Sequence, residues 1–466
     1  MTPQYTPYPG TRRKLVLAFD VGTTYSGISY SILDPGQVPE IKGVIRFPGH
    51  EQIRGESKIP TVLYYDKSGN VRAIGAEAMR EGIAETALDE GWTKAEWFKL
   101  HIRPKRAGLD RITASIPPLP PGKTVIRVLA DFLRYFRECA MVYIKGAHPN
   151  GEDLWRSISS DIEYVISHPN GWEGYQQSQI RSAIVLAGLV PDTVSGNARV
   201  TFLTEGEASL HFAIDYGFPA KSMKAGEGVI IVDAGGGTID ISAYRKKEDK
   251  VNKFEETTIA QCHFFGSVFV SVQARVFLEE YLKDSDFYED LDHIVKCFDK
   301  STKVRFQNDA QMEYIKFGAT RDNDPSCNIR YESNSNQSML TIAIVLWSVR
   351  LTYDKYIVLV GGFSASEWLV SKVDEALKPF GLSVIRPDSL VNKAVSDGAV
   401  SFYLNRFVRV RVAKMAYGTK CIWHYDPNDE EHQSRKSTMI VNAAGDKMIP
   451  GRFDTIISKV AELLFP

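Results

Sequence analysis

The sequence is poor in cysteine, with five residues in a chain of 466. None of them forms a Cys-x-x-Cys pair, and their number is odd. This pattern argues against a disulfide framework and against a zinc site, and it is typical of reduced thiols inside the cell. The cysteines are Cys139, Cys262, Cys297, Cys327 and Cys421.

Long apolar runs and a strong net charge are also missing. The most hydrophobic stretches, 341–347 and 356–360, are too short to span a membrane. The first fourteen residues contain three prolines and no apolar signal segment. A formal net charge of −1, without a dense Lys/Arg run, gives no attraction to nucleic acid or to an anionic membrane. We therefore expect a cytoplasmic protein, with a nuclear location as the alternative, that binds neither nucleic acid nor membrane.

Two common nucleotide-binding motifs are absent. No Gly-x-x-x-x-Gly-Lys-Ser/Thr loop occurs, which excludes the P-loop mode of ATP binding. No Gly-x-Gly-x-x-Gly opens a helix, so a dinucleotide-binding fold has no support.

The sequence does contain one hairpin pattern twice, more than two hundred positions apart, at 15–27 and at 229–240. Each copy is an apolar strand that runs into an aspartate, Asp20 or Asp233, followed by a Gly-rich turn with a hydroxyl and a return strand. Turn glycines let backbone N–H groups approach a phosphate, and an aspartate at a strand end offers a hard oxygen to Mg²⁺. Two such hairpins facing each other would clamp one nucleotide between two related lobes.

Short apolar runs predict buried parallel strands at 15–19, 161–166, 229–232 and 356–360. A helix-length segment, 174–189, follows one of them. This alternation of strand and helix predicts the α/β class.

Both hairpins resemble the phosphate-binding motifs of the heat-shock 70-kDa chaperones. Residues 20–26 are nearly the first motif as it stands, and 233–240 match the second. Residues 357–364 resemble the adenosine motif, in which paired glycines let base and ribose lie against the backbone. Further matches, in chain order, are a first connecting helix (178–189), an acidic hinge stretch (204–208) and a second connecting helix (394–400).

The resemblance implies a two-lobed, actin-like ATPase fold of the ribonuclease H-like type with a short C-terminal extension. It implies this division: a flexible N-terminus (1–13), lobe I (14–220), lobe II (221–389), a return helix to lobe I (390–412) and the extension (413–466). We expect the extension to form strand, turn and strand over 438–449, and a helix over 455–464. No full peptide-binding β-sandwich with a helical lid follows, which argues against peptide refolding.

The resemblance also implies the ligands, ATP or ADP with Mg²⁺, and the residues that contact them. Asp20, Asp233 and Asp240 would hold the metal, although Asp240 could simply cap or pair. Glu205 matches the hinge carboxylate that helps order the metal shell and the attacking water, and Thr238 would lie near that water. The phosphates and the adenosine would contact Gly22, Thr23, Thr24, Tyr25, Gly235, Gly236, Gly237, Gly266, Gly361, Gly362 and Phe363.

Two lysines complete the expected site. Lys99 falls where the catalytic lysine of these chaperones should lie, and the alternative is a solvated helix lysine beside core aromatic residues. Lys303 falls where they stack basic side chains on adenine, and the alternative is an ordinary amphipathic helix. One departure is Gly206, which replaces the hinge proline and loosens that segment.

Three functions are compatible with these residues. The first is a slow Mg-dependent ATPase whose lobe closure reports the nucleotide state to a protein partner or co-chaperone. The second is a nucleotide-sensing scaffold, or pseudo-ATPase, that binds without hydrolysis. The third is a small-metabolite kinase on the same fold, which needs a further general-base aspartate that the sequence does not supply.

Overall fold

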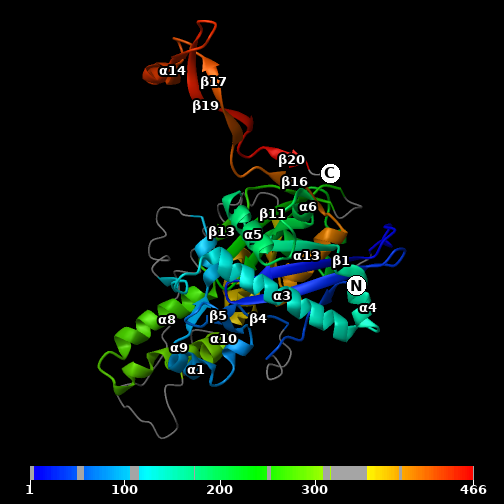
Figure 1. Ribbon diagram of the computed structural model, residues 1–466, viewed down its shortest axis with the longest axis vertical. Coiled ribbons are helices and arrows are strands. Elements are labelled where there is room, and N and C mark those ends of the chain that lie inside the picture. The colour runs from blue at the N-terminus through cyan, green and yellow to red at the C-terminus, as the bar shows by residue number, and fades with distance from the viewer. Residues whose placement is uncertain are drawn as a thin grey trace.

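The computed structural model describes residues 5–49, 57–104, 115–172, 174–248, 253–307, 315, 354–387 and 391–464. It is a mixed α/β protein with two large sheets, two small sheets and helices packed around them (Figure 1). The predicted α/β class is confirmed.

The first large sheet has the order β3-β2-β1-β8-β9. The strand β1 (Lys14–Val21) is antiparallel to β2 (Tyr25–Leu33) on one side and parallel to β8 (Ile162–His168) on the other. The next strand, β9 (Val200–Thr204), runs parallel to β8. Nearly every residue of β1 is buried, as expected for a strand covered on both faces. Short strands at its edge are β3 (Lys42–Gly43) and β4 (Ile59–Pro60).

The second large sheet repeats this arrangement. It pairs β10 (Gly228–Ala234) with β11 (Ile239–Lys246) in antiparallel fashion and with β14 (Asp354–Val360) in parallel. Parallel to β14 lies β15 (Ser383–Ile385). The order β2-β1-β8-β9 of the first sheet thus corresponds to β11-β10-β14-β15 of the second. In both sheets a hairpin is followed by two parallel strands, so the duplication seen in the sequence extends to the topology. Four strands enlarge this sheet: β12 (Phe254–Glu256), β13 (Gln261–His263), β16 (Val408–Val412) and β20 (Glu462–Leu464).

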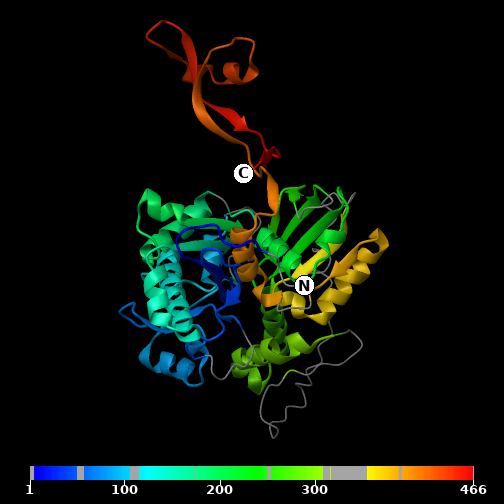
Figure 2. The same cartoon turned by 90° about the vertical axis from the view of Figure 1, so that its right-hand side faces the viewer.

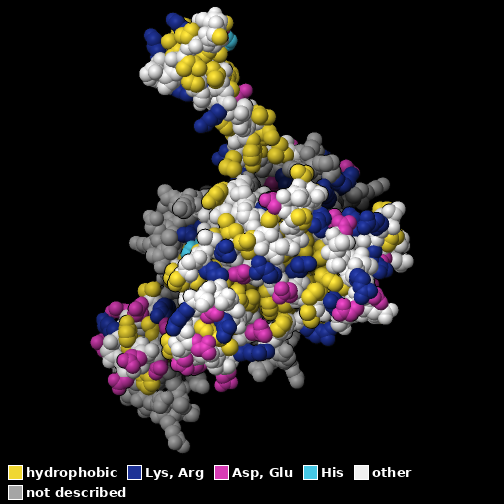
Figure 3. All heavy atoms as spheres, in the orientation of Figure 1, with side chains coloured by type: hydrophobic (Ala, Val, Ile, Leu, Met, Phe, Trp, Pro, Cys, Tyr) yellow, Lys and Arg dark blue, Asp and Glu magenta, His cyan; other side chains and the backbone are white. Residues whose placement is uncertain are grey.

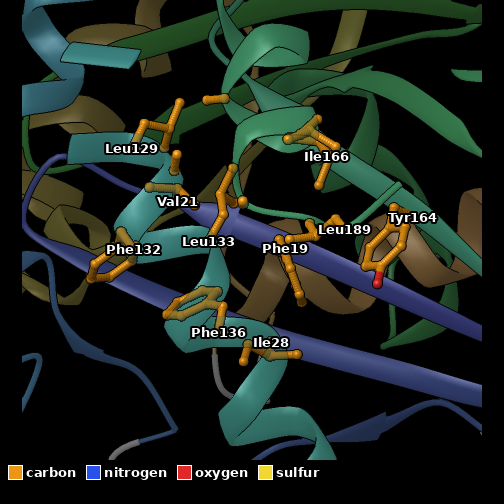
Figure 4. Close-up of a cluster of buried hydrophobic side chains, with 14 of the residues drawn as sticks. Phe19, Val21, Ile28, Leu129, Phe132, Leu133, Phe136, Tyr164, Ile166 and Leu189 are labelled. Carbon is orange, nitrogen blue, oxygen red and sulfur yellow. The ribbon is translucent and has the colours of Figure 1, made fainter. Parts of the chain in front are cut away.

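A large apolar core holds α3 (Val125–Ala147) against the first sheet. Leu133 and Phe136 on this helix lie next to Phe19 and Ile28 on the hairpin (Figure 4), and the Phe132 ring packs against that of Phe136. The Phe19 and Phe136 rings meet edge to face with centroids 5.4 Å apart. Burying this side of β1 fixes the strand that carries the first aspartate of the repeat. Also in contact with α3 are α4 (Gly151–Ile158) and α5 (Tyr175–Leu186).

Two helices lie between the large sheets, α7 (Glu205–Asp215) and α13 (Ala394–Leu404), with α13 drawn in orange between the blue and the green halves (Figure 2). The helix α7 contacts β8 and β9 as well as β10 and β11. The prediction that 178–189 is the first connecting helix is therefore wrong, because this segment forms α5, which packs on α3 at the outside of the first sheet. The helix that meets α13 is α7.

The close approach of these two helices depends on Gly398. A Cβ at this position would overlap the carbonyl oxygen of Ala208 and lie 2.6 Å from its carbonyl carbon. We expect Gly398→Ala to lower the free energy of unfolding by about 3 kcal/mol, since backbone rather than a flexible side chain must move. Urea denaturation measures this. The control is Gly146→Ala near the end of α3, where a Cβ meets nothing within 4 Å; equal stabilities of the two variants would contradict the expectation.

The remaining helices and strands cover the outer parts of the two halves. Beside the first sheet, a small sheet of order β6-β5-β7 packs with α1. Beside the second sheet, α12 packs on one face, while α8, α9 and α10 form a separate cluster. Their bounds are β5 Val62–Tyr65, β6 Val71–Ile74, β7 Thr93–Glu96, α1 Ile83–Glu90, α8 Ser267–Tyr281, α9 Leu291–Cys297, α10 Lys303–Arg305 and α12 Glu367–Leu377.

The C-terminal extension projects from the body as a hairpin (Figures 1 and 2). It pairs β17 (Tyr417–His424) with β19 (Lys447–Ile457), which also pairs with β18 (Ile440–Val441). The predicted strand, turn and strand over 438–449 are confirmed. The predicted helix over 455–464 is wrong: the segment ends β19 and then forms β20, which pairs with β16. Apolar side chains are exposed along this projection (Figure 3).

Two further observations complete the fold. In the part of the N-terminal segment that the structure describes, the Tyr5 hydroxyl donates to Asp215 Oδ2 at 2.6 Å, and Tyr8 exchanges backbone hydrogen bonds with Gln37 and Gly36. Among the described helices, none combines the length and hydropathy needed to cross a bilayer.

Candidate functional site

The turns of the two repeated hairpins are in direct contact. A Cβ on Gly236 would lie 2.9 Å from Cγ2 of Thr24, and a Cβ on Gly237 would lie 2.9 Å from Cβ of Thr23. Both positions therefore accept only glycine while the turns stay in this arrangement. The structure brings together two segments that are more than two hundred residues apart in the chain.

Each hairpin ends its first strand with a buried aspartate. Asp20 is 3% exposed and Asp233 is 5% exposed. In the antiparallel registers, Asp20 lies opposite Gly27, and Asp233 lies opposite Asp240. The two copies are thus equivalent in backbone but unequal in charge, since the second carries an additional carboxylate.

The carboxylate of Asp20 has two partners from other elements. Nζ of Lys58 lies 2.6 Å from its Oδ2, and the Ser167 hydroxyl donates to its Oδ1 at 3.3 Å. Ser167 reaches it because β8 runs parallel to β1 in the register that places 166 beside 19. Lys58, which precedes β4, is absent from the site predicted from the sequence.

The two carboxylates of the second hairpin are held by different donors. Oδ2 of Asp233 accepts a hydrogen bond of 2.9 Å from the Ser209 hydroxyl on α7. Oδ1 of Asp240 accepts the backbone N–H of Asn170 at 2.5 Å. Its Oδ2 is buried and has no hydrogen-bond partner in the part of the chain that the structure describes.

Lys99 and Glu205 form a buried ion pair beside these aspartates. Lys99 lies on the short 3₁₀ helix η2 (Phe98–Ile102), and its Nζ is 2.6 Å from Oε1 of Glu205, the first residue of α7. The side chains are 8% and 10% exposed. The ammonium also lies 5.8 Å from the ring centroid of Trp172. The alternative of a solvated helix lysine is wrong for Lys99.

The pKa values of the buried acidic groups, Asp233, Asp240 and Glu205, are shifted by burial and by one another. Burial, followed by Glu205, raises the pKa of Asp233 to about 7, with a smaller contribution from Asp20. Burial and then Glu205 also raise the pKa of Asp240. Burial raises the pKa of Glu205, although Lys99 opposes this rise. Burial lowers the pKa of Lys99, but Glu205 and Asp20 outweigh it and the net direction is upward.

The balance of charge fits a divalent cation. Four buried carboxylates (Asp20, Glu205, Asp233 and Asp240) face two ammonium groups, those of Lys58 and Lys99. Lys58 and Lys99 pair with Asp20 and Glu205, whereas the pKa values of Asp233 and Asp240 are raised, so negative charge on these two aspartates needs compensation by a proton, a cation or a donor. Carboxylate oxygens are the ligands that Mg²⁺ prefers.

These carboxylates do not form a closed cage for the metal. Among the residues described by the structure, no three His, Cys, Asp or Glu side chains have the arrangement of an ion site. This is compatible with Mg²⁺, which keeps several waters and commonly binds one or two carboxylates together with phosphate oxygens.

Most residues expected to contact the phosphates lie in the two turns themselves. The N–H of Gly22 donates to the Ser26 hydroxyl at 3.2 Å, which shapes the first turn. The N–H of Gly235 donates to the carbonyl of Thr238 at 2.9 Å, which closes the second. Thr238 is buried, whereas the side chain of Tyr25 is half exposed.

Of the residues expected near the adenosine, Gly361 lies beside the second hairpin, whereas Gly362 and Phe363 have different surroundings. Gly361, with φ of +89°, follows β14, and a Cβ there would lie 2.5 Å from the carbonyl oxygen of Ala234, the residue after Asp233. Gly362 is exposed, and a Cβ there would meet nothing within 4 Å. Phe363 packs partly into the core of the second sheet.

Gly266 and Lys303 connect the second turn to the helical cluster. Gly266 lies at the start of α8, and the N–H of the next residue, Ser267, donates to the carbonyl of Gly235 at 3.1 Å. Nζ of Lys303 lies 2.9 Å from the Ser271 hydroxyl and 2.5 Å from Oδ1 of Asp299. Lys303 Nζ also lies 3.4 Å from the carbonyl oxygen of Ser267, which is close to the second turn, but its ion pair is with Asp299 of its own helical cluster.

Fold and site together define a mixed α/β protein with a duplicated, carboxylate-tipped hairpin. No family model matches the chain. Over an alignment of 532 positions, the chain is 22% identical to heat shock 70 kDa protein 12B of Homo sapiens, with 92% of this chain and 75% of that protein covered. The chain is thus distantly similar to a heat-shock 70-kDa protein.

Proposed function

We propose that the chain binds ATP or ADP with Mg²⁺ between its two glycine turns and hydrolyses ATP slowly. The observation that carries this proposal is the meeting of the turns, Thr23 and Thr24 against Gly236 and Gly237, each turn following a strand that ends in a buried aspartate. Backbone N–H groups of glycine turns are suited to phosphate oxygens. The proposal includes that the two halves of the molecule are the lobes of an actin-like fold.

Each residue of the site has a separate role in the proposed ATP hydrolysis. Asp20 and Asp233, on opposite hairpins, would hold the hydrated metal, and Asp240 lies opposite Asp233 in the β10–β11 register. When bound, the metal neutralises charge on the phosphates. Lys99 orients Glu205, and Glu205 orients the attacking water near Thr238. Phosphoryl transfer requires mainly positioning and charge compensation, so these groups suffice for slow hydrolysis without a covalent nucleophile.

Nucleotide binding requires a movement. A phosphate cannot lie between the turns while Thr24 contacts Gly236, so the two halves must separate and close again around the ligand. The contact of α7 with α13 between the sheets is the natural hinge region. A ligand that binds one arrangement better shifts the equilibrium toward it, and a protein partner or co-chaperone would read that change. The cytoplasmic or nuclear location remains part of this proposal.

Calorimetric titration tests the proposal directly. Purified protein is titrated with MgATP and MgADP, and the titrations are repeated with EDTA. Saturable binding that weakens in EDTA is expected, because Asp20 and Asp233 would hold the cation that offsets the charge of the phosphates. The absence of heat in all arms would exclude the proposed function. Binding without turnover in a subsequent single-turnover assay would indicate the nucleotide-sensing pseudo-ATPase.

A further inference from the structure

Lys58 lies beside the first glycine turn because the backbone around it is fixed there. The strand β4 that follows it pairs Ile59 with Ser26 and Pro60 with Tyr25. The N–H of Thr61 donates to the carbonyl of Thr24 at 2.8 Å. The main chain at Lys58 is therefore tied to the hairpin that carries Thr23 and Thr24.

The side chain of Lys58 reaches Asp20 across Gly27. Gly27 lies directly opposite Asp20 in the β1–β2 pair. A Cβ on Gly27 would be 3.1 Å from Cγ of Lys58, so the lysine stem occupies the space that a side chain at 27 would fill. In the second hairpin the equivalent position is Asp240. The first hairpin thus has Lys58 over Asp20, whereas the second has the carboxylate of Asp240 opposite Asp233.

This ion pair differs from a surface salt bridge. The side chain of Lys58 is 15% exposed and that of Asp20 is 4% exposed, with 2.6 Å between Nζ and Oδ2. A lysine ammonium on a flexible four-carbon stem can exchange one oxyanion for another within its reach. Phosphate oxygens brought to the adjacent turn would be such an alternative acceptor.

We propose, on the basis of the proposed function, that Lys58 is a phosphate-binding residue that rests on Asp20 while the site holds no nucleotide. Lys58 turns from Asp20 to the terminal phosphate when the metal–nucleotide complex binds, which frees Asp20 for the metal shell. Two consequences follow. ATP retains affinity without metal, because Lys58 supplies a positive charge. A metal ion alone binds weakly, because it must compete with Lys58 for Asp20.

Two titrations of the full chain test this assignment. The first measures ATP affinity in EDTA, and the second measures Mn²⁺ affinity without nucleotide. The variants are Lys58→Met, which keeps the length of the side chain, and Lys58→Arg, which keeps the charge. The control is Lys94→Met, because Lys94 pairs with Glu96 on β7 and both side chains are partly exposed.

We expect Lys58→Met to lower metal-free ATP affinity by about ten- to a hundredfold, the loss of one charge-assisted hydrogen bond. Its Mn²⁺ affinity should rise by about tenfold, the order of effect that one neighbouring charge has on a carboxylate. Lys58→Arg should keep most of the ATP affinity, and Lys94→Met should match the wild type in both titrations. A merely structural lysine would lower both affinities.

Several results would overturn the assignment. These are an ATP affinity of Lys58→Met equal to that of the wild type, an equal loss in Lys58→Arg, or an Mn²⁺ affinity that does not rise. If the wild-type protein binds no nucleotide under any condition, the proposed function fails as well. The two failures are distinguishable, because the Mn²⁺ titration reads the Lys58–Asp20 pair without nucleotide.

Discussion

Replacing Gly236 by valine is expected to lower ATP affinity at least about a hundredfold. A Cβ at this position would already lie 2.9 Å from Cγ2 of Thr24, and the valine methyl groups extend further into the same space. A phosphate that binds the turn must approach the backbone here, which a branched side chain prevents. The affinity is measured by calorimetry with MgATP.

Two companion variants separate this effect from a general loss of structure. Gly236→Ala adds one methyl group and should produce a smaller decrease in affinity. Gly146→Val makes the same change of residue where a Cβ meets nothing within 4 Å, and it should bind MgATP like the wild type. Urea denaturation of each variant checks that the fold is kept. Normal MgATP affinity in Gly236→Val would show that the phosphates bind elsewhere.

The duplicated hairpin was predictable because it is local. Strand, aspartate, glycine turn and return strand are adjacent in the chain at 15–27 and 229–240, and apolar runs that end at Asp20 and Asp233 mark the strand ends. The structure forms both hairpins, and their neighbours β8 and β14 are the parallel strands expected from apolar runs. What the pattern could not give is the distance between the two turns, which depends on how the sheets pack.

The helix that meets α13 was misassigned because the match of 178–189 to the connecting helix rested on resemblance, and contacts between helices distant in the chain are not marked in the sequence. In α7 every residue except Ile214 is buried, including Glu207, Ser209 and His211. Polar and apolar residues of α7 are buried alike against two sheets and α13, so an apolar face could not reveal how this helix packs. By contrast, α5 has exposed positions and packs on α3.

Lys58 and the C-terminal segment were missed for a different reason, which is that long-range pairing decides their structure. Lys58 reaches Asp20 across Gly27 from the position before a strand of two residues, and no spacing in the sequence marks this contact. Residues 455–457 are β-branched, and they continue β19 because β17 provides a partner strand. The β-branched run favours a strand, but the apolar spacing of 455–464 also fits a helix, and only the partner strand decides between them.

Replacing Lys99 by methionine is expected to reduce single-turnover ATP hydrolysis about a thousandfold while MgATP affinity changes much less. The Lys99 ammonium lies 2.6 Å from Glu205 in a site where both side chains are about nine-tenths buried. Methionine fills similar volume but cannot orient Glu205 or compensate its charge. Groups that position and stabilise charge in a buried site commonly contribute factors of a hundred or more to the rate. Rapid quench of a pre-formed MgATP complex measures the hydrolysis rate.

The stability of Lys99→Met, and of a double variant built on it, distinguishes a catalytic role of Lys99 from a structural one. Lys99→Met leaves the Glu205 carboxylate buried without its partner, which should lower the free energy of unfolding by about 3–5 kcal/mol unless Glu205 takes up a proton. With the opposing effect of Lys99 removed, the pKa of Glu205 rises further above its ordinary value, so this loss should grow as pH increases. Adding Glu205→Gln removes the unpaired charge and should restore stability. If turnover returned together with stability in this double variant, the pair would serve only the fold; continued absence of turnover in a stable protein that still binds MgATP would assign the chemistry to Lys99 and Glu205.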